Sequence, residues 1–186
     1  MRRVTGKPQM YTGGGDSGRT NLVGKKQVSK GSHRIDVLGE LDELSAALGM
    51  ARAAAGQELT RTILASIQQD IYMLMASLAV AGKAKDDPRL DPARVTWLEE
   101  QIDVVAARTK VPKGFIIPGD AAGGAALDFA RTVARRVERR VVRQVDRGRK
   151  IAQASLSYLN RLSSLLFVLE LYELETQSIK PTLAKQ

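Results

Sequence analysis

Length, composition and charge limit what this chain can be. It has 186 residues, of which 44% are hydrophobic and only 4% aromatic, and its formal net charge is +9. A chain of this length can bury one sizeable core, so we predict a single domain over residues 1–186. The absence of cysteine excludes disulfides and thiolate metal sites. The positive charge favours polyanionic partners such as nucleotides, nucleic acid or acidic membranes.

The apolar pattern predicts a loop-like arm followed by five helices. Residues 1–32 are rich in glycine and lysine and show no sustained period. Apolar residues then recur every three or four positions, as in helices that bury one face, over residues 33–55, 58–81, about 92–110, about 121–147 and about 151–175. The expected buried stripes include Ile63, Ile67, Ile71, Leu74 and Leu78 in the second helix, and Val133, Val137, Val141 and Val145 in the fourth.

Capping residues and short connections complete this prediction. Ser32 and Asp91 stand where N-caps are expected, Pro92 suits a first helical turn, and Gly148 suits a helix end. The predicted fold class is all-α: a compact five-helix bundle over residues 33–176, of the four-helix-bundle or ferritin-like type, with an irregular N-terminal arm over residues 1–32.

The chain shows no sign of export or membrane insertion. Its first residues, MRRVTGKPQMYTGGG, are basic but lack the apolar stretch of a signal peptide. The longest apolar run, residues 72–81, is too short to cross a bilayer. We therefore expect a cytoplasmic protein without a membrane partner.

A glycine-rich stretch in the arm, GGGDSGRT over residues 13–20, is one residue away from a phosphate-binding P-loop. A P-loop needs a buried strand before it and a helix after it, and the flanking residues suit neither. Consecutive glycine N–H groups can still surround an anion as a nest, with charge from Arg19, Lys25, Lys26 and Lys30. The sequence leaves open whether this stretch is an anion site or a disordered basic tail.

The fourth predicted helix carries an unusual concentration of arginine. Arg131, Arg135 and Arg139 are four residues apart and share one face, while Arg136, Arg140 and Arg143 form a neighbouring strip. Arginine offers fixed, bidentate donors to phosphate oxygens, so a triphosphate site is one interpretation. A solvated basic face is the other.

Several blocks, in order and over nearly the whole chain, resemble one known family. They are YTGGGDSGRTNL, KKQVSKGSHRIDVLGELDELSAALG, WLEEQID, FIIPGD, ARTVARRVERRVV and YLNRLSSLLFVL. These blocks are similar to those of the ATP:cob(I)alamin adenosyltransferases of the propanediol-utilisation type. Each block alone is weakly specific, whereas the combination is specific.

This resemblance implies a fold, a reaction and a set of partners. It implies a homotrimer of helical bundles with active sites between subunits and ATP under the N-terminal arm. The reaction would transfer the 5′-deoxyadenosyl group of ATP to the cobalt of reduced cobalamin and release triphosphate. Mg²⁺ is expected to accompany ATP, and no protein ligand to cobalt is expected. A cobalamin reductant and an adenosylcobalamin-dependent enzyme are the implied partners.

The resemblance also assigns site residues. Asp42 is expected to pair with Arg131 of a second subunit on the cobalamin side. Phe115 is expected to face the corrin and keep the lower ligand from cobalt, although it could also be a core plug. Arg135 is expected to stabilise the leaving triphosphate. The expected ATP contacts are Thr12, Gly13, Gly14, Gly15, Thr20, Asn21, Lys30, Arg135, Arg136, Val137, Glu138, Arg139 and Asn160, the last of which could instead form an interhelical hydrogen bond.

Four residues depart from the family pattern. Gly14 and Ser17 remove a hydroxyl and a charge near the phosphates, Ser164 replaces a common aspartate, and Asp120 replaces a glycine and could cap the fourth helix. Two other functions remain as alternatives. One is a basic helical protein that binds nucleic acid. The other is a nucleotide or cobalamin delivery module that kept the fold without turnover.

Overall fold

The computed structural model describes residues 10–80 and 89–185. It consists of a small hairpin, β1 (Arg19–Leu22) and β2 (Lys25–Ser29), followed by five helices. These are α1 (His33–Ala54), α2 (Glu58–Ala79), α3 (Ala93–Ala106), α4 (Ala122–Asp146) and α5 (Gln153–Thr176). The prediction of an all-α bundle of five helices is therefore confirmed. No helix in the described ranges is long and apolar enough to span a membrane.

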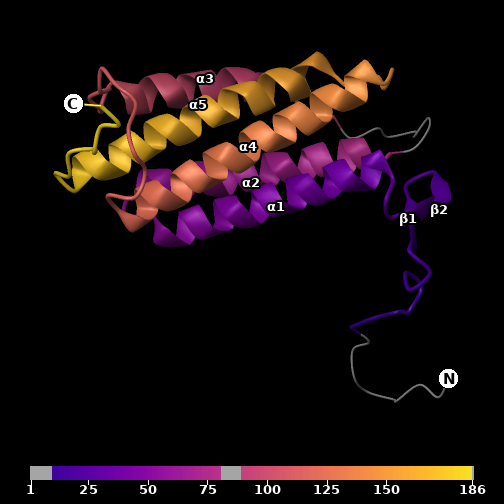
Figure 1. Cartoon of the computed structure of the whole chain (residues 1–186). Helices are drawn as coiled ribbons and strands as arrows, with labels where there is room; N and C mark the ends of the chain where they lie inside the picture. Colours follow the sequence, from indigo (N-terminus) through magenta and orange to yellow (C-terminus); the bar gives the residue numbers. More distant parts are fainter. Residues whose placement is uncertain (1–9, 81–88, 186) are drawn as a thin grey trace.

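The helices lie side by side along one long axis (Figure 1). Helix α4 packs between α1 and α5, α2 packs on α1, and α3 covers the outer side of α5. The short connection between α4 and α5 makes these two helices antiparallel neighbours, as is usual in bundles. Helices α4 and α5 carry seven of the residues predicted to bind ligands, and the arm carries seven others.

The core follows the predicted stripes of α2 and α4 with one exception. The α2 stripe Ile63, Ile67, Ile71, Leu74 and Leu78 is buried, and so are Val133, Val137 and Val141 in α4. Val145 was predicted to continue the α4 stripe, but its side chain is 37% exposed. Each step of four residues advances by about 40° beyond a full turn, so the third step carries Val145 out of the buried sector.

The helix ends show which capping predictions hold. Ser32 occupies the N-cap position of α1, but its side chain makes no capping hydrogen bond. Before α3, Asp91 Oδ1 accepts a hydrogen bond from Ala93 N at 2.9 Å, so its predicted capping role is confirmed. Helix α3 ends at Ala106 rather than near residue 110, because the amides of Arg108 and Thr109 bond three residues back and tighten the last turn.

The arm is more ordered than its sequence predicted. The two strands pair antiparallel through a tight turn in which Gly24 has φ +80°. Asn21 Oδ1 accepts a hydrogen bond from the N–H of Gln27, a residue with φ +56°, and so supports the irregular pairing. The prediction of a wholly irregular arm was wrong, because two very short strands around a glycine turn leave little periodic signal.

A polar network ties α3 to the rest of the bundle. Asp70 of α2 accepts hydrogen bonds from Arg94 of α3 and, at 2.7 Å, from the buried hydroxyl of Tyr158 of α5. The guanidinium of Arg94 also stacks 3.9 Å from the ring centroid of Trp97. Burial and the charge of Asp70 raise the pKa of Tyr158, which therefore stays a neutral donor.

Candidate functional site

A continuous surface strip joins α4 and α5. Asn160 Nδ2 donates to Glu138 Oε1 at 2.9 Å, so two predicted ATP residues that are 22 positions apart touch directly. Seven residues earlier on α4 and seven later on α5, Arg131 and Phe167 line the same cavity. Seven residues correspond to about 10 Å of helix. The cavity and the Glu138–Asn160 contact therefore lie about two turns apart on one face.

The contact between Glu138 and Asn160 is part of a longer chain of polar groups. Asn160 Oδ1 accepts a hydrogen bond from Arg161 Nη1 at 2.7 Å, and Arg161 Nε donates to Glu99 of α3 at 2.9 Å. The interhelical hydrogen bond considered for Asn160 is thus present. It fixes the orientation of the amide at the surface, which suits a group that positions a ligand.

The arginines of α4 fall into two sets. Arg136 forms ion pairs with Glu40 and Glu43 of α1, and these carboxylates raise its pKa. Arg140 pairs with Glu40 as well. Arg135, in contrast, is exposed and forms no ion pair or hydrogen bond with any residue that the structure describes. Its guanidinium is free to bind an anion.

Two other residues of the same motif differ in their accessibility. Arg139 is exposed and, like Arg135, has no partner within the described ranges. The side chain of Val137 is completely buried in the core. A side-chain contact between Val137 and ATP is therefore unavailable in the folded chain.

The cavity at the other end of the strip has a volume of about 530 Å³. The loop before α4 forms one wall, and Asp128, Arg131 and Phe167 form the other. Phe115 stands at this loop with 90% of its surface exposed, which excludes the core-plug interpretation. A large aromatic ring left in water beside an apolar cavity is typical of a surface that binds an apolar partner or ligand.

Charged groups line the base of this cavity. Arg131 Nη2 pairs with Asp128 Oδ1 at 2.6 Å within α4. Glu170, which feels the charges of both residues, is 1% exposed, and its Oε2 has no hydrogen-bond partner in the described part of the chain. Burial and the nearby charge of Asp128 raise the pKa of Glu170 to about 7. Sequence patterns did not reveal Glu170, because it sits on the α5 stripe as an apolar residue would.

The C-terminal segment holds the Phe115 loop in place. Thr182 donates from its N–H and its hydroxyl to Asp120, both at 2.8 Å, and these bonds lower the pKa of Asp120. Ala184 N donates to Phe115 O at 2.8 Å. The prediction that Asp120 caps α4 was wrong, because the N-cap is Ala121 and the Asp120 carboxylate is occupied by Thr182. No sequence motif indicated this role of the segment.

The glycine loop of the arm is folded into two successive turns. Gly13 and Gly18 have φ of +69° and +71°, and Gly14 N donates to Thr12 Oγ1 at 3.3 Å. Lys30 Nζ lies so close to Gly15 that a Cβ added there would be 2.8 Å away. The structure therefore brings the predicted lysine to the predicted glycine loop. Such an arrangement of amides and an ammonium group suits a phosphate.

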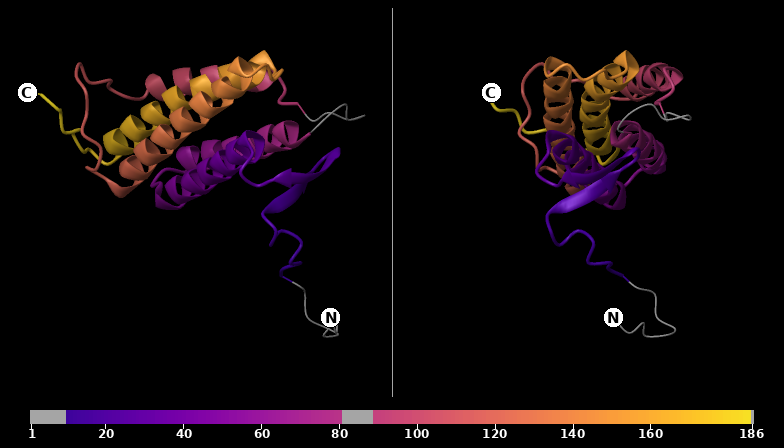
Figure 2. Two further views of the ribbon diagram at one scale, coloured as in Figure 1. Left: turned by 45° about the vertical axis from the view of Figure 1, so that its right-hand side comes forward. Right: turned by 90° about the vertical axis from the view of Figure 1, so that its right-hand side faces the viewer.

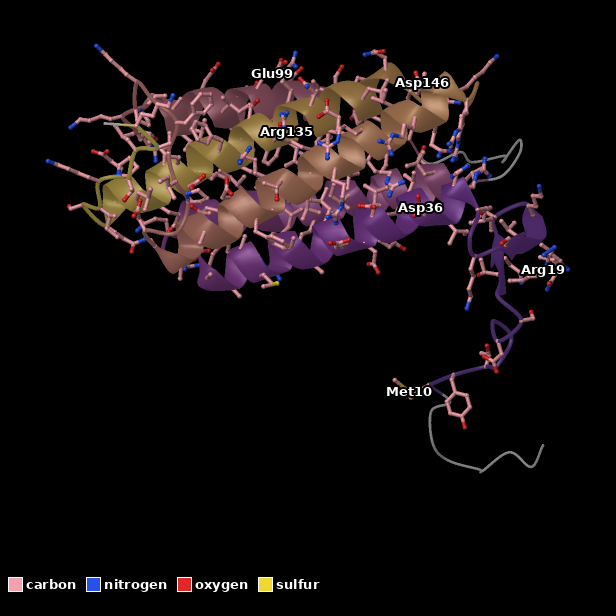
Figure 3. All side chains as sticks on the ribbon, in the orientation of Figure 1. Met10, Arg19, Asp36, Glu99, Arg135 and Asp146 are labelled. Carbon is pink, nitrogen blue, oxygen red and sulfur yellow. The ribbon has the colours of Figure 1, made fainter. Side chains whose placement is uncertain are left out.

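Within one chain the arm lies apart from the surface strip on α4 and α5. The arm leaves the bundle at the start of α1 and extends from the side formed by α1 and α2 (Figure 2). Figure 3 shows Arg19 and Met10 on the arm and Arg135 in the middle of α4. Asp42, on α1, is exposed and has no partner among the described residues. The two halves of the predicted site are thus present, but they do not meet in a single copy.

Comparison with known proteins agrees with this geometry. A family model described as cobalamin adenosyltransferase matches residues 10–173. The chain belongs to this family. The match includes the arm from Met10, the α4 arginines, and α5 up to Glu173.

Corrinoid adenosyltransferases with similar sequences come from several bacteria. The chain is 38% identical over 163 residues to the corrinoid adenosyltransferase PduO of Salmonella typhimurium, covering 86% of this chain and 48% of that protein. It is 38% identical over 164 residues to the corrinoid adenosyltransferase of Bacillus subtilis, covering 86% of this chain and 83% of that protein. The chain therefore spans about half the length of the Salmonella relative and most of the Bacillus one.

Solved structures of the family share the fold. One is a variant of the PduO-type ATP:corrinoid adenosyltransferase from Lactobacillus reuteri, complexed with cobalamin and ATP. It has a TM-score of 0.86 and 30% identity, and the comparison covers 96% of this chain and 100% of that one. Another variant of that enzyme, complexed with ATP, has a TM-score of 0.83 and 31% identity, covering 95% of this chain and 100% of that one.

Proposed function

We propose that this chain transfers the 5′-deoxyadenosyl group of ATP to the cobalt of reduced cobalamin, giving adenosylcobalamin and triphosphate. The observation that carries the proposal is the strip on α4 and α5. It places Arg135, which is exposed and has no partner among the described residues, between an oriented Glu138–Asn160 pair and an apolar cavity. Family membership and the ligands named for the Lactobacillus reuteri structures support the same reaction.

ATP would be held by two sets of residues. Arg135 and Arg139 would bind the triphosphate, because guanidinium groups match phosphate oxygens in geometry and charge. Glu138 and Asn160 would orient the nucleoside. Without Val137, whose side chain is buried in the core, the proposed set is Thr12, Gly13, Gly14, Gly15, Thr20, Asn21, Lys30, Arg135, Arg136, Glu138, Arg139 and Asn160. Arg136 would act mainly by joining α4 to Glu40 and Glu43.

Cobalamin would occupy the cavity beside Phe115. The ring of Phe115 offers an apolar wall without a donor atom, so it would displace the lower axial ligand without replacing it. Loss of an axial donor makes reduction of the cobalt easier. Phe167 would extend the apolar wall, and Arg131 would provide the polar edge of the pocket.

The reaction itself needs mainly positioning and charge stabilisation. An electron pair of Co(I) would form the new bond to C5′. The bond from C5′ to the triphosphate oxygen would break at the same time, and the triphosphate would leave with the two electrons of that broken bond. Arg135 would stabilise the negative charge that develops on the triphosphate. A reductant has to supply the electron that produces Co(I), and an adenosylcobalamin-dependent enzyme would use the product.

Mg²⁺ would enter with ATP, because hard cations bridge phosphate oxygens. The described residues contain no cluster of three or more histidine, aspartate or glutamate side chains that could hold a metal. Bound to the nucleotide, Mg²⁺ would neutralise part of the charge on the leaving triphosphate. The α4 arginines would share this role from the protein side.

A second copy of the chain would complete the site. The arm carries the glycine loop and Lys30, but it extends away from the strip of its own chain (Figure 2). The exposed Asp42 and the exposed Phe115 are further groups left for a neighbour. We propose a homotrimer in which Asp42 pairs with Arg131 of the adjacent subunit. Such a pair fixes orientation more than it adds affinity.

The reaction can be tested in an anaerobic assay with Mg-ATP and chemically reduced cobalamin. The expected result is adenosylcobalamin, followed by its spectrum, together with an equal amount of triphosphate. ATP binding without product would instead favour a delivery or sensing module. Salt-sensitive binding to random duplex with no ATP binding would favour the nucleic-acid alternative.

The role of Arg135 can be tested with a matched variant. Arg135→Ala removes charge-assisted hydrogen bonds worth about 1.5–3 kcal/mol, so kcat/KM for ATP is expected to fall by about 10- to 150-fold. Arg143→Ala removes an exposed arginine two turns further along α4 and is expected to change kcat/KM by less than about twofold. Equal activities of the two variants would contradict the assignment.

Complementation tests whether two chains form each site. Lys30→Ala and Arg135→Ala are each expected to be at least about tenfold less active alone. When the two variants are co-expressed with different tags, a site shared between chains can combine the intact Lys30 of one with the intact Arg135 of the other. Recovery of activity in the doubly tagged oligomer supports the shared site, whereas an inactive mixed oligomer would place both residues in one chain's site.

A further inference from the structure

A second cavity lies at the end of the bundle where α1 begins and α2 ends. Its volume is about 440 Å³, and it is bordered by Arg34, Ser77, Arg89, Arg149 and Lys150. The α4–α5 connection forms one side of it. Arg135 lies eleven residues before the end of α4, which corresponds to about 16 Å of helix. The cavity is therefore separate from the strip described above.

The lining of this cavity is strongly basic. Four of the described lining residues are arginine or lysine. No described lining residue is acidic. Arg149 Nη2 donates to Leu78 O at 2.6 Å, and Arg34 Nη1 donates to Val80 O at 3.3 Å. These bonds place positive charge at the C-terminus of α2, where it interacts favourably with the helix dipole. They use one nitrogen of each guanidinium and leave the other donors available.

One of these remaining donors is buried without a partner among the residues that the structure describes. Within residues 10–80 and 89–185, Arg149 Nη1 has neither contact with solvent nor a hydrogen-bond acceptor. Burial and the nearby charge of Arg34 lower the pKa of Arg149 to about 10. An unpaired buried donor on a charged group is costly. A negatively charged acceptor in the cavity would satisfy Nη1 and relieve the repulsion between the two guanidinium groups.

We propose that this cavity binds the phosphate group of a small ligand, separately from the nucleotide site on α4 and α5. Arg149 and Arg34 would provide forked donors to phosphate oxygens, and Lys150 and the hydroxyl of Ser77 would add to them. The cavity also has apolar lining, including Leu78 and Ile151, and its volume exceeds what a single oxyanion needs. The same site could thus take inorganic phosphate or the phosphate of a small organic molecule.

The experiment measures phosphate binding in the absence of cobalamin. The full-length Arg135→Ala protein is used because nucleotide binding at the strip on α4 and α5 is expected to be weaker in it. It is titrated with inorganic phosphate, inorganic triphosphate and AMP. The readouts are calorimetry and the rise in Tm that a ligand of the native state causes. Saturable binding of inorganic phosphate and of AMP at equal affinity identifies the phosphate group alone as the ligand. Tighter binding of AMP identifies an organic phosphate.

Three further variants in the same background test the residues. Arg149→Gln is expected to weaken phosphate binding at least tenfold. Lys150→Gln, which changes an exposed side chain at the cavity edge, is expected to weaken it about threefold and guards against misfolding of the first variant. Arg147→Gln removes the same charge from an exposed residue that does not line the cavity and is expected to leave binding unchanged.

The outcomes separate this proposal from the transferase reaction. Adenosyl transfer by Arg149→Gln in the otherwise unchanged protein is expected to match that of the parent chain. No saturable phosphate binding would overturn the proposal. Equal losses in Arg149→Gln and Arg147→Gln would also overturn it, because binding would then depend on net charge alone.

Discussion

The buried acid Glu170, which lies close to the Asp128–Arg131 pair, gives a quantitative prediction. Glu170 is 1% exposed, and its pKa is raised from 4.5 to about 7, mainly by burial and then by the charge of Asp128. The folded protein therefore holds a proton on Glu170 at pH values where the unfolded chain has released it. The stability that this proton provides is complete below pH 4.5 and is lost as the pH rises through about 7.

The size of the effect follows from the shift. A change from 4.5 to about 7 corresponds to about 3 kcal/mol over the full range, and to about 2–3 kcal/mol between roughly pH 5 and 8.5. Glu170→Gln keeps the shape of the protonated acid but cannot ionise. The free energy of unfolding of the parent chain, minus that of the variant, is therefore expected to fall by this amount across the interval.

The assay is urea unfolding at several pH values and one protein concentration, since assembly also changes apparent stability. Comparing the two proteins at each pH cancels the contributions of all other ionisable groups. Glu175→Gln, at an exposed position of α5, is the control and is expected to show no such trend. A difference between Glu170→Gln and the parent chain that stays constant with pH would refute the argument.

Further predictions concern the supports of the site. Asp70→Ala removes the shared acceptor of Arg94 and Tyr158. Chemical denaturation is expected to show a free energy of unfolding lower by about 3–5 kcal/mol. A loss below about 1 kcal/mol would show that the network is dispensable. Asp120→Ala removes both acceptors of Thr182 and is expected to speed hydrogen exchange at the Thr182 amide and to raise KM for cobalamin more than KM for ATP. An unchanged hydrogen-exchange rate at the Thr182 amide would contradict the proposal that Asp120 and Thr182 hold the Phe115 loop in place.

Much of the site was predictable because its residues follow helical periods. Arg131, Arg135 and Glu138 share a face of α4 by their spacing alone, and α5 brings Asn160 to that face because both helices bury apolar stripes against each other. The separation of Arg136 from Arg135 was not predictable in this way. It depends on the position of α1, whose Glu40 and Glu43 occupy Arg136 and leave Arg135 free.

The sequence by itself determined the five helices, the buried stripes and the family, because period, caps and ordered motifs are local properties of the chain. Only the tertiary structure decided which polar groups meet. It paired Asp120 with Thr182 across 62 positions, left Phe115 exposed beside a cavity, and gathered Arg34 and Arg149 at the end of α2. Such contacts join segments far apart in the sequence, and their energies depend on burial and neighbouring charge. Neither quantity exists until the helices have packed.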